Sequence, residues 1–102
     1  GLKSQLDKII STIINHNEIY NVHDYHVWTI SNDMNALSCH AVVSETMSVQ
    51  NCEGLLKTIE HELLHLNIQH MTIQLETGVL PKSKRSEKVV GRISYHSQKT
   101  WV

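Results

Sequence analysis

The sequence has little cysteine and no long hydrophobic run, and each shortage excludes a class of protein. Cys39 and Cys52 are the only cysteines among 102 residues, so we expect reduced thiols rather than a disulfide framework. The apolar runs are a few residues long, far below the roughly 20 needed to cross a bilayer. The N-terminus also does not have the pattern of a signal peptide. We therefore predict a fragment that is itself soluble.

An excess of one charge sign is also missing, since the formal net charge is −1. This balance, with 40% hydrophobic residues, indicates one ordinary globular domain and argues against a nucleic-acid binder. The charges are nevertheless divided along the chain. Residues 1–76 carry three lysines and nine acidic residues, whereas residues 77–102 carry six basic residues and one glutamate.

This division predicts a domain over residues 1–76 and a basic, flexible tail over residues 77–102. Within the tail, the segment VVGRISYH is rich enough in β-branched and aromatic residues to pair as an edge strand instead. A weak contact of the tail with anionic lipid is a further alternative to a fully solvated tail. Gly1 stands where a start methionine would, so we expect that the chain was cut from a longer parent or that Gly1 is the remnant of a tag.

Hydrophobic periodicity predicts two helices and three strands. Apolar residues at helical spacing indicate helices over residues 2–14 and about 50–66. Residues 22–30 and 36–43 have the composition of strands joined by a polar turn, and residues 68–76 alternate as a half-buried strand does. The order α-β-β-α-β predicts an α+β, two-layer sandwich in which two helices cover one face of a three-stranded, mostly antiparallel sheet.

The second predicted helix contains His61-Glu62-Leu63-Leu64-His65, the HExxH spacing of zinc metalloproteases. In a chain with eight histidines this match has low specificity. On a helical wheel, the core face is formed by Cys52, Leu55, Leu56, Ile59, Leu63 and Leu66. His61 and His65 point away from that face, and no later helix returns a third ligand. We therefore expect no enzyme here and at most a weak surface site at His61 and His65.

Four other histidines fall in or beside the predicted strands: His23, His26, His40 and His70. Strand alternation places His40, His70 and Glu76 on the sheet face away from the helices. His23 and His26 differ by an odd number, so only one of them joins that face unless a bulge intervenes. Imidazoles and a carboxylate form a ligand set that suits zinc. The alternative is that each histidine is an ordinary polar residue.

Two stretches of the chain together resemble one protein family. The stretch VHDYHVWTISNDMNALSCHAVV, followed after one helix by HMTIQLE, resembles the cytoplasmic C-terminal domain of the cation diffusion facilitator metal transporters. The match spans about residues 2–76. It implies a ferredoxin-like, homodimeric domain on the cytoplasmic side of a membrane, attached in the parent to a transmembrane domain that exports zinc or a related ion.

The resemblance also implies that the domain senses metal near its dimer interface and biases transport. It assigns ligand roles to His23, His40 and Glu76, with His70 less secure and with His26 and Asp24 as second choices. The implied ion is Zn²⁺, with Co²⁺, Cd²⁺ or Ni²⁺ as alternatives. A metal-independent dimerisation module is the competing interpretation.

Overall fold

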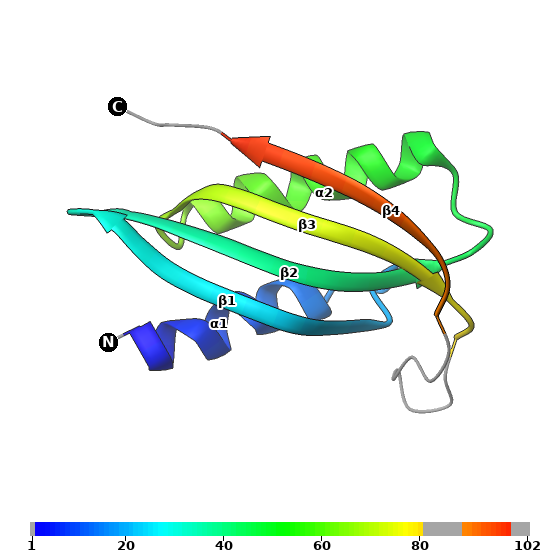
Figure 1. Ribbon diagram of the computed structural model, residues 1–102, viewed down its shortest axis with the longest axis horizontal. Helices are drawn as coiled ribbons and strands as arrows, with labels where there is room; N and C mark the ends of the chain where they lie inside the picture. The colour runs from blue at the N-terminus through cyan, green and yellow to red at the C-terminus, as the bar shows by residue number, and fades with distance from the viewer. Residues whose placement is uncertain (1, 81–88, 99–102) are drawn as a thin grey trace.

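The computed structural model describes residues 2–80 and, as backbone, residues 89–98 (Figure 1). Its elements are α1 (Leu2–Ile14), β1 (Asn21–Ser31), β2 (Met34–Ser44), α2 (Val49–Leu64), β3 (Ile68–Gly78) and β4 (Val89–Gln98). The strands form one sheet in the order β1-β2-β3-β4. The β2–β3 pair is parallel, and the β1–β2 and β3–β4 pairs are antiparallel. Both helices lie on one face (Figure 1), which confirms the predicted two-layer α+β sandwich.

The sheet has a fourth strand in addition to the three predicted. Residues 89–98 form β4 and pair with β3, so this part of the predicted tail takes the edge-strand alternative. Residues 77 and 78 extend β3. The remaining tail segments, 81–88 and 99–102, lie outside the described residues, so their flexibility and any lipid contact stay predictions.

The core lies between the helices and the covered face of the sheet. Its α1 members include Ile9 and Ile13, each 0% exposed. The predicted core face of α2 is confirmed: five of its six residues are buried, and Leu66 packs partly buried against them. Leu37, Cys39, Ala41 and Val43 of β2 and Met71, Ile73 and Leu75 of β3 complete the layer. Burial of this apolar surface is the main term that stabilises the fold.

Local chemistry fixes the two ends of α2. Ser48 is the N-cap, and its side chain accepts a hydrogen bond from the Asn51 backbone N–H at 3.0 Å. After the helix, Asn67 has φ 64°, a left-handed conformation that asparagine tolerates better than most residues. The chain can therefore turn sharply into β3. Over the part of the chain that the structure describes, neither helix has the length and hydropathy of a membrane span.

Candidate metal site

A β-bulge in β1 brings both histidines of the HDYH stretch to the open face of the sheet, the face away from the helices. His23 pairs with His40 and His26 pairs with Ser38, so two residues of β1, Asp24 and Tyr25, lie opposite a single residue of β2. Asp24 has φ 51°, a conformation that aspartate adopts more readily than most residues and that is typical of a bulge. With the extra residue, His23 and His26 lie on the same face of the sheet, although their numbers differ by three. The structure thus has the bulge that the sequence left open as an alternative.

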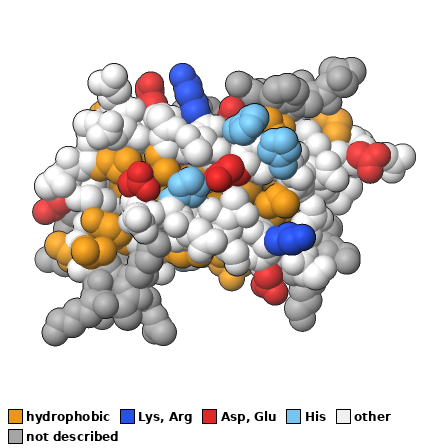
Figure 2. All heavy atoms as spheres, turned by 180° about the vertical axis from the view of Figure 1, so that it is seen from behind, with side chains coloured by type: hydrophobic (Ala, Val, Ile, Leu, Met, Phe, Trp, Pro, Cys, Tyr) orange, Lys and Arg blue, Asp and Glu red, His pale blue; other side chains and the backbone are white. Residues whose placement is uncertain are grey.

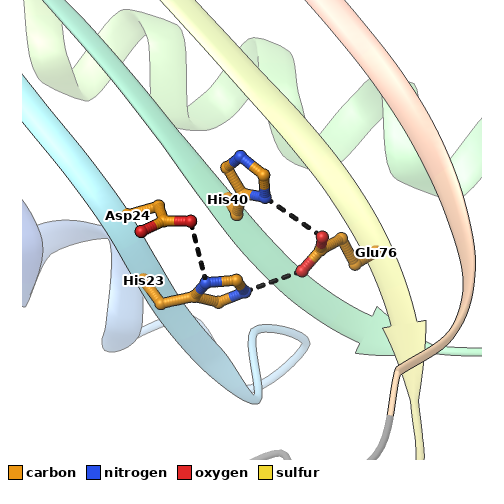
Figure 3. Close-up of polar contacts among 4 residues, drawn as sticks. All are labelled: His23, Asp24, His40 and Glu76. Atoms are coloured by element: carbon orange, nitrogen blue, oxygen red, sulfur yellow. Dashed lines mark hydrogen bonds and ion pairs between the residues drawn. The ribbon is translucent and has the colours of Figure 1, made fainter.

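Three side chains from three adjacent strands converge on this face: His23 of β1, His40 of β2 and Glu76 of β3 (Figure 3). The Nε2 atom of His23 lies 2.7 Å from Oε1 of Glu76, and Nδ1 of His40 lies 3.0 Å from Oε2. The two imidazole ring centroids are 5.1 Å apart. Each carboxylate oxygen thus accepts a hydrogen bond from one histidine, and the three side chains form one cluster.

Glu76 is the buried member of the cluster. Its side chain is 2% exposed, against 40% for His23 and 26% for His40. Burial by itself raises the pKa of Glu76, but the hydrogen bonds from His40 and His23 and their charge lower it by more, so the pKa lies below its usual value. The carboxylate is therefore held ionised, with its two oxygens directed at the two imidazoles.

Asp24 and His26 lie beside the cluster, on the exposed side of β1. Oδ2 of Asp24 is 3.9 Å from Nδ1 of His23, and its side chain is 72% exposed (Figure 3). A shallow hollow of about 370 Å³ is lined by Asp24, His26, Ser38, Cys39, His40, Thr72 and Gln74. The two second-choice residues therefore border the cluster, although neither belongs to the group of three whose ligand atoms are close together.

His70 lies on the open face but outside the cluster. It pairs with Ala36, whereas Gln74 pairs with His40 and Glu76 pairs with Val42. Glu76 lies six positions after His70 in β3, a path of about 20 Å at the rise of a strand. An ion bound by Glu76 is out of reach of His70, so the geometry does not support the predicted inclusion of His70 in the same ligand set.

The HELLH residues lie on the other side of the molecule. His61 and His65 are both exposed, as the wheel predicted. Glu62, which would be the base of a metalloprotease, instead has its Oε1 2.6 Å from Nε2 of His16. Among residues 4–80, whose side chains the structure describes, no third ligand joins this pair in a three-residue group that could hold the metal of such an enzyme.

The cysteines do not add ligands to the cluster. Cys39 precedes His40 but its side chain is buried in the core under the helices. Burial raises the pKa of its thiol to about 12 and raises the pKa of Cys52 as well. A thiol that stays protonated at neutral pH is a poor metal ligand, because metals bind the thiolate.

The cluster fits a divalent ion of the zinc type. The candidate ligand atoms of His23, His40 and Glu76 all lie within 4.8 Å of one another. A tetrahedral zinc with bonds of about 2.0–2.1 Å holds its ligand atoms roughly 3.3 Å apart. Side-chain rotations that move these atoms by about an ångström would therefore bring them to the distances that zinc requires. Three protein ligands leave one position open, and exposed Asp24, water or a residue of another chain can fill it.

Sequence reasoning found the three residues but not their contacts. Strand alternation was enough to place His40 and Glu76 on one face, whereas the place of His23 depended on the bulge. The signal that was available is Asp24 itself, an aspartate within a run of strand-forming residues, because aspartate tolerates positive φ. The contact between His16 and Glu62 joins residues 46 positions apart and gives no sequence signal.

Comparison with known proteins gives a family match and curated relatives. A family described as the cytoplasmic domain of cation efflux proteins matches residues 2–78. A cadmium, cobalt and zinc/H⁺-K⁺ antiporter of Bacillus subtilis is 51% identical over 69 residues, which cover 68% of this chain and 22% of that protein. An antiporter of the same description from Bacillus velezensis is 48% identical over 70 residues, covering 69% of this chain and 22% of the relative. The chain thus spans about a fifth of the length of these relatives.

Solved structures give the same fold. The metal-bound C-terminal domain of the CzcD transporter from Thermotoga maritima has a TM-score of 0.67 and 21% identity, covering 74% of this chain and 88% of that one. The cytosolic domain of a cation diffusion facilitator family protein has the same score and identity and is covered to 90%. With the family match over residues 2–78, these findings show that the chain belongs to the cytoplasmic domain family of the cation diffusion facilitators, the cation efflux proteins.

Proposed function

We propose that this domain binds one zinc or related divalent ion at His23, His40 and Glu76 and serves as the regulatory and dimerisation domain of a membrane cation exporter. The observation that carries the proposal is the convergence of two imidazoles from two strands on one buried carboxylate (Figure 3). Burying a carboxylate is costly unless it is paired. If the two histidines were ordinary polar surface residues, nothing would require them to meet on a buried carboxylate.

In this proposal, the ion replaces the hydrogen bonds that the two histidines donate to Glu76. An ionised carboxylate only accepts hydrogen bonds, so the ring nitrogens that contact Glu76 carry protons. An ion can bind these nitrogens only after the protons leave them, either to the other nitrogen of a neutral imidazole or from an imidazolium to water. Acid should weaken binding because protons compete with the ion for the imidazole nitrogens, and metal affinity should rise as pH rises toward neutral.

The choice of ion follows from the donor set. Two imidazoles and one carboxylate are borderline ligands that suit Zn²⁺ and accept Co²⁺, Cd²⁺ or Ni²⁺. The names of the two Bacillus relatives, cadmium, cobalt and zinc antiporters, support the same class of ion for the parent of this domain. In that parent the domain would lie on the cytoplasmic side of the membrane, attached to its own transmembrane domain.

The open face also favours a second copy of the chain. Both described helices cover the same face of the sheet (Figure 1), and the edge strand β1 exposes large hydrophobic side chains along its length. Tyr25, Trp28 and Ile30 are 42%, 47% and 50% exposed. A second protomer that covers this region would hide them and could complete the coordination of the ion. Metal occupancy and the dimer arrangement would then be thermodynamically linked.

These exposed side chains also support the competing function, a dimerisation module that needs no metal. In that case Tyr25, Trp28 and Ile30 would drive association by themselves, and the histidines would only solvate the carboxylate. The two functions differ in one measurable respect, because only the regulatory domain changes its zinc occupancy and its shape together.

The test is zinc stoichiometry by equilibrium dialysis on the native chain and on two matched double variants. His23→Ala with His40→Ala removes two proposed ligands, and His61→Ala with His65→Ala removes the same residue types from α2. We expect the first variant to lose the tight ion and the second to keep it. The opposite result, or no tight zinc in the native chain, would rule out the proposed site.

X-ray scattering with and without saturating zinc tests the regulatory part of the proposal. We expect zinc to change the size or shape of the dimer. An identical scattering curve in a protein that has bound its ion would leave a metal-binding dimer without a regulatory response. Unchanged dimerisation with no zinc uptake would support the metal-independent module.

A further inference from the structure

The outer surface of α2 carries a second pair of histidines, unconnected with the cluster on the sheet. His61 and His65 are both exposed, and their ring centroids are 5.1 Å apart with the rings at 86°. Figure 2, which shows the helix side of the molecule, has two histidine side chains adjacent to each other on this surface. The pair therefore faces away from the side of the sheet that holds His23, His40 and Glu76.

The spacing of the pair follows from helix geometry. Residues four apart lie one above the other on the same face of a helix, and the core contacts of Ile59 and Leu63 hold α2 with that face outward. His65 is also the C-cap of α2, where the last carbonyl groups carry partial negative charge that favours a bound cation. The helix thus presents two imidazoles side by side at its negative end.

The charged neighbours leave the two imidazoles accessible. Glu62 points to His16, 2.6 Å away, so it is not held against the pair. Lys57 lies one turn before His61 and is exposed. Its flexible side chain can extend into water, where the repulsion of an ion is screened.

We propose that His61 and His65 form a bidentate surface site for divalent ions that prefer nitrogen ligands, Cu²⁺ and Ni²⁺ ahead of Zn²⁺. An ion bound to two imidazoles at about 2.0–2.1 Å holds the ring centroids about 4.5–5.2 Å apart, depending on the bond angle. The observed separation of 5.1 Å matches this range, so binding needs side-chain rotation but no movement of the helix. Water completes the coordination.

The ion preference separates this pair from the sheet cluster. With two neutral imidazoles, no carboxylate and no imposed geometry, affinity follows the general order in which Cu²⁺ and Ni²⁺ bind more tightly than Co²⁺. Two exposed ligands also bind more weakly than three partly buried ones. The pair should therefore fill only at higher metal concentrations. The inference does not depend on the proposed function, because the two sites share no residue.

The test is titration of the full chain with NiCl₂ by calorimetry, in a His23→Ala, His40→Ala background that removes the sheet ligands. We expect one Ni²⁺ to bind, and His61→Ala or His65→Ala to weaken it at least about tenfold, the scale on which a disturbed metal site loses affinity. His70→Ala, which removes a histidine of the open face, should leave binding unchanged. Equal Ni²⁺ affinity with and without His61 and His65 would overturn the proposal.

A rescue variant tests the geometry and guards against a folding artefact. His65→Ala combined with Lys57→His recreates the four-residue spacing one turn earlier, at positions 57 and 61, both of which are exposed. We expect Ni²⁺ affinity to return to within about threefold of the value before either change. A double variant that is folded by circular dichroism and still does not bind would refute chelation by histidines at this spacing.

Discussion

The two faces of the sheet use the same strands for different purposes. On the covered face, alternate residues of β2 and β3 are apolar and lie in the core, with Ala41 and Ile73 0% exposed. On the open face the side chains of β2 and β3 are mainly polar, and among residues 4–80 its one buried charged group, Glu76, is 1% exposed. The covered face therefore stabilises the fold by excluding water from apolar side chains. The open face holds a carboxylate whose burial has a cost in free energy.

Burial contributes to the free energy of folding with opposite sign on the two faces. A buried apolar side chain contributes favourable free energy in proportion to its area. A buried carboxylate costs free energy unless it is paired, and here two imidazoles pair it. We therefore expect changes on the covered face to affect mainly folding, and changes in the cluster to affect mainly metal binding.

The largest effect on folding should come from Ile59→Ala. Ile59 is 0% exposed in the core, so the truncation should destabilise the domain by about 2–5 kcal/mol. Urea denaturation of the metal-free protein measures this loss. Zinc stoichiometry below the unfolding transition should not change, and a lost ion in a folded variant would contradict the separation of the two faces.

The largest effect on metal binding should come from Glu76→Gln. The amide keeps the shape of the side chain but cannot act as an anionic ligand, so zinc affinity should fall by more than about 100-fold, or about 2.7 kcal/mol. Competition with a chelator measures this change. His70→Ala is the matched control on the same strand and face, and a comparable loss in that variant would show that the ion is not bound as proposed.

The bulge at Asp24 and Tyr25 brings His23 and His26 to the same face of the sheet. Substitutions of Asp24 should separate the effect of its backbone conformation from the effect of its charge. Asp24→Val places a β-branched residue at φ 51°, which should cost about 1–2 kcal/mol and misplace His23. Asp24→Gly accepts the same backbone without strain. We expect zinc affinity to fall in the valine variant and to be largely kept in the glycine variant. Equal losses in both would instead make Asp24 a ligand.

A smaller effect should appear in acid, in protein kept free of metal. Because the pKa of folded Glu76 is lowered, its ionised form contributes stability above the unfolded pKa. That contribution is lost as pH falls through the folded value. Thermal unfolding measured from neutral pH to below pH 4 should show a steeper loss for the native chain than for Glu76→Gln. Parallel curves would mean that the cluster does not stabilise the carboxylate.

Much of this molecule could be predicted from sequence because the signals were local. Helical periodicity placed Cys52, Leu56 and Ile59 toward the core and His61 and His65 toward water, and the structure agrees. Strand alternation likewise separated His40 and Glu76 from the apolar residues between them. The structure places His70 on the same face but outside the cluster, because alternation identifies a face and gives no position along it.

The remaining features depend on which strands are neighbours. The composition of residues 89–98 predicts part of a flexible tail, with an edge strand as the alternative, and in the structure they pair with β3 as the strand β4.

The order of the first five elements, the core face of each helix and the residue types available to bind metal can be predicted from the sequence alone. These follow from the side-chain periods of helices and strands, which are local properties of the chain. The contact of His23 and His40 with Glu76 could not be predicted in this way, since contact among three strands depends on their register and on a single extra residue in β1. Periodicity tells which way a side chain points, and register tells what it meets.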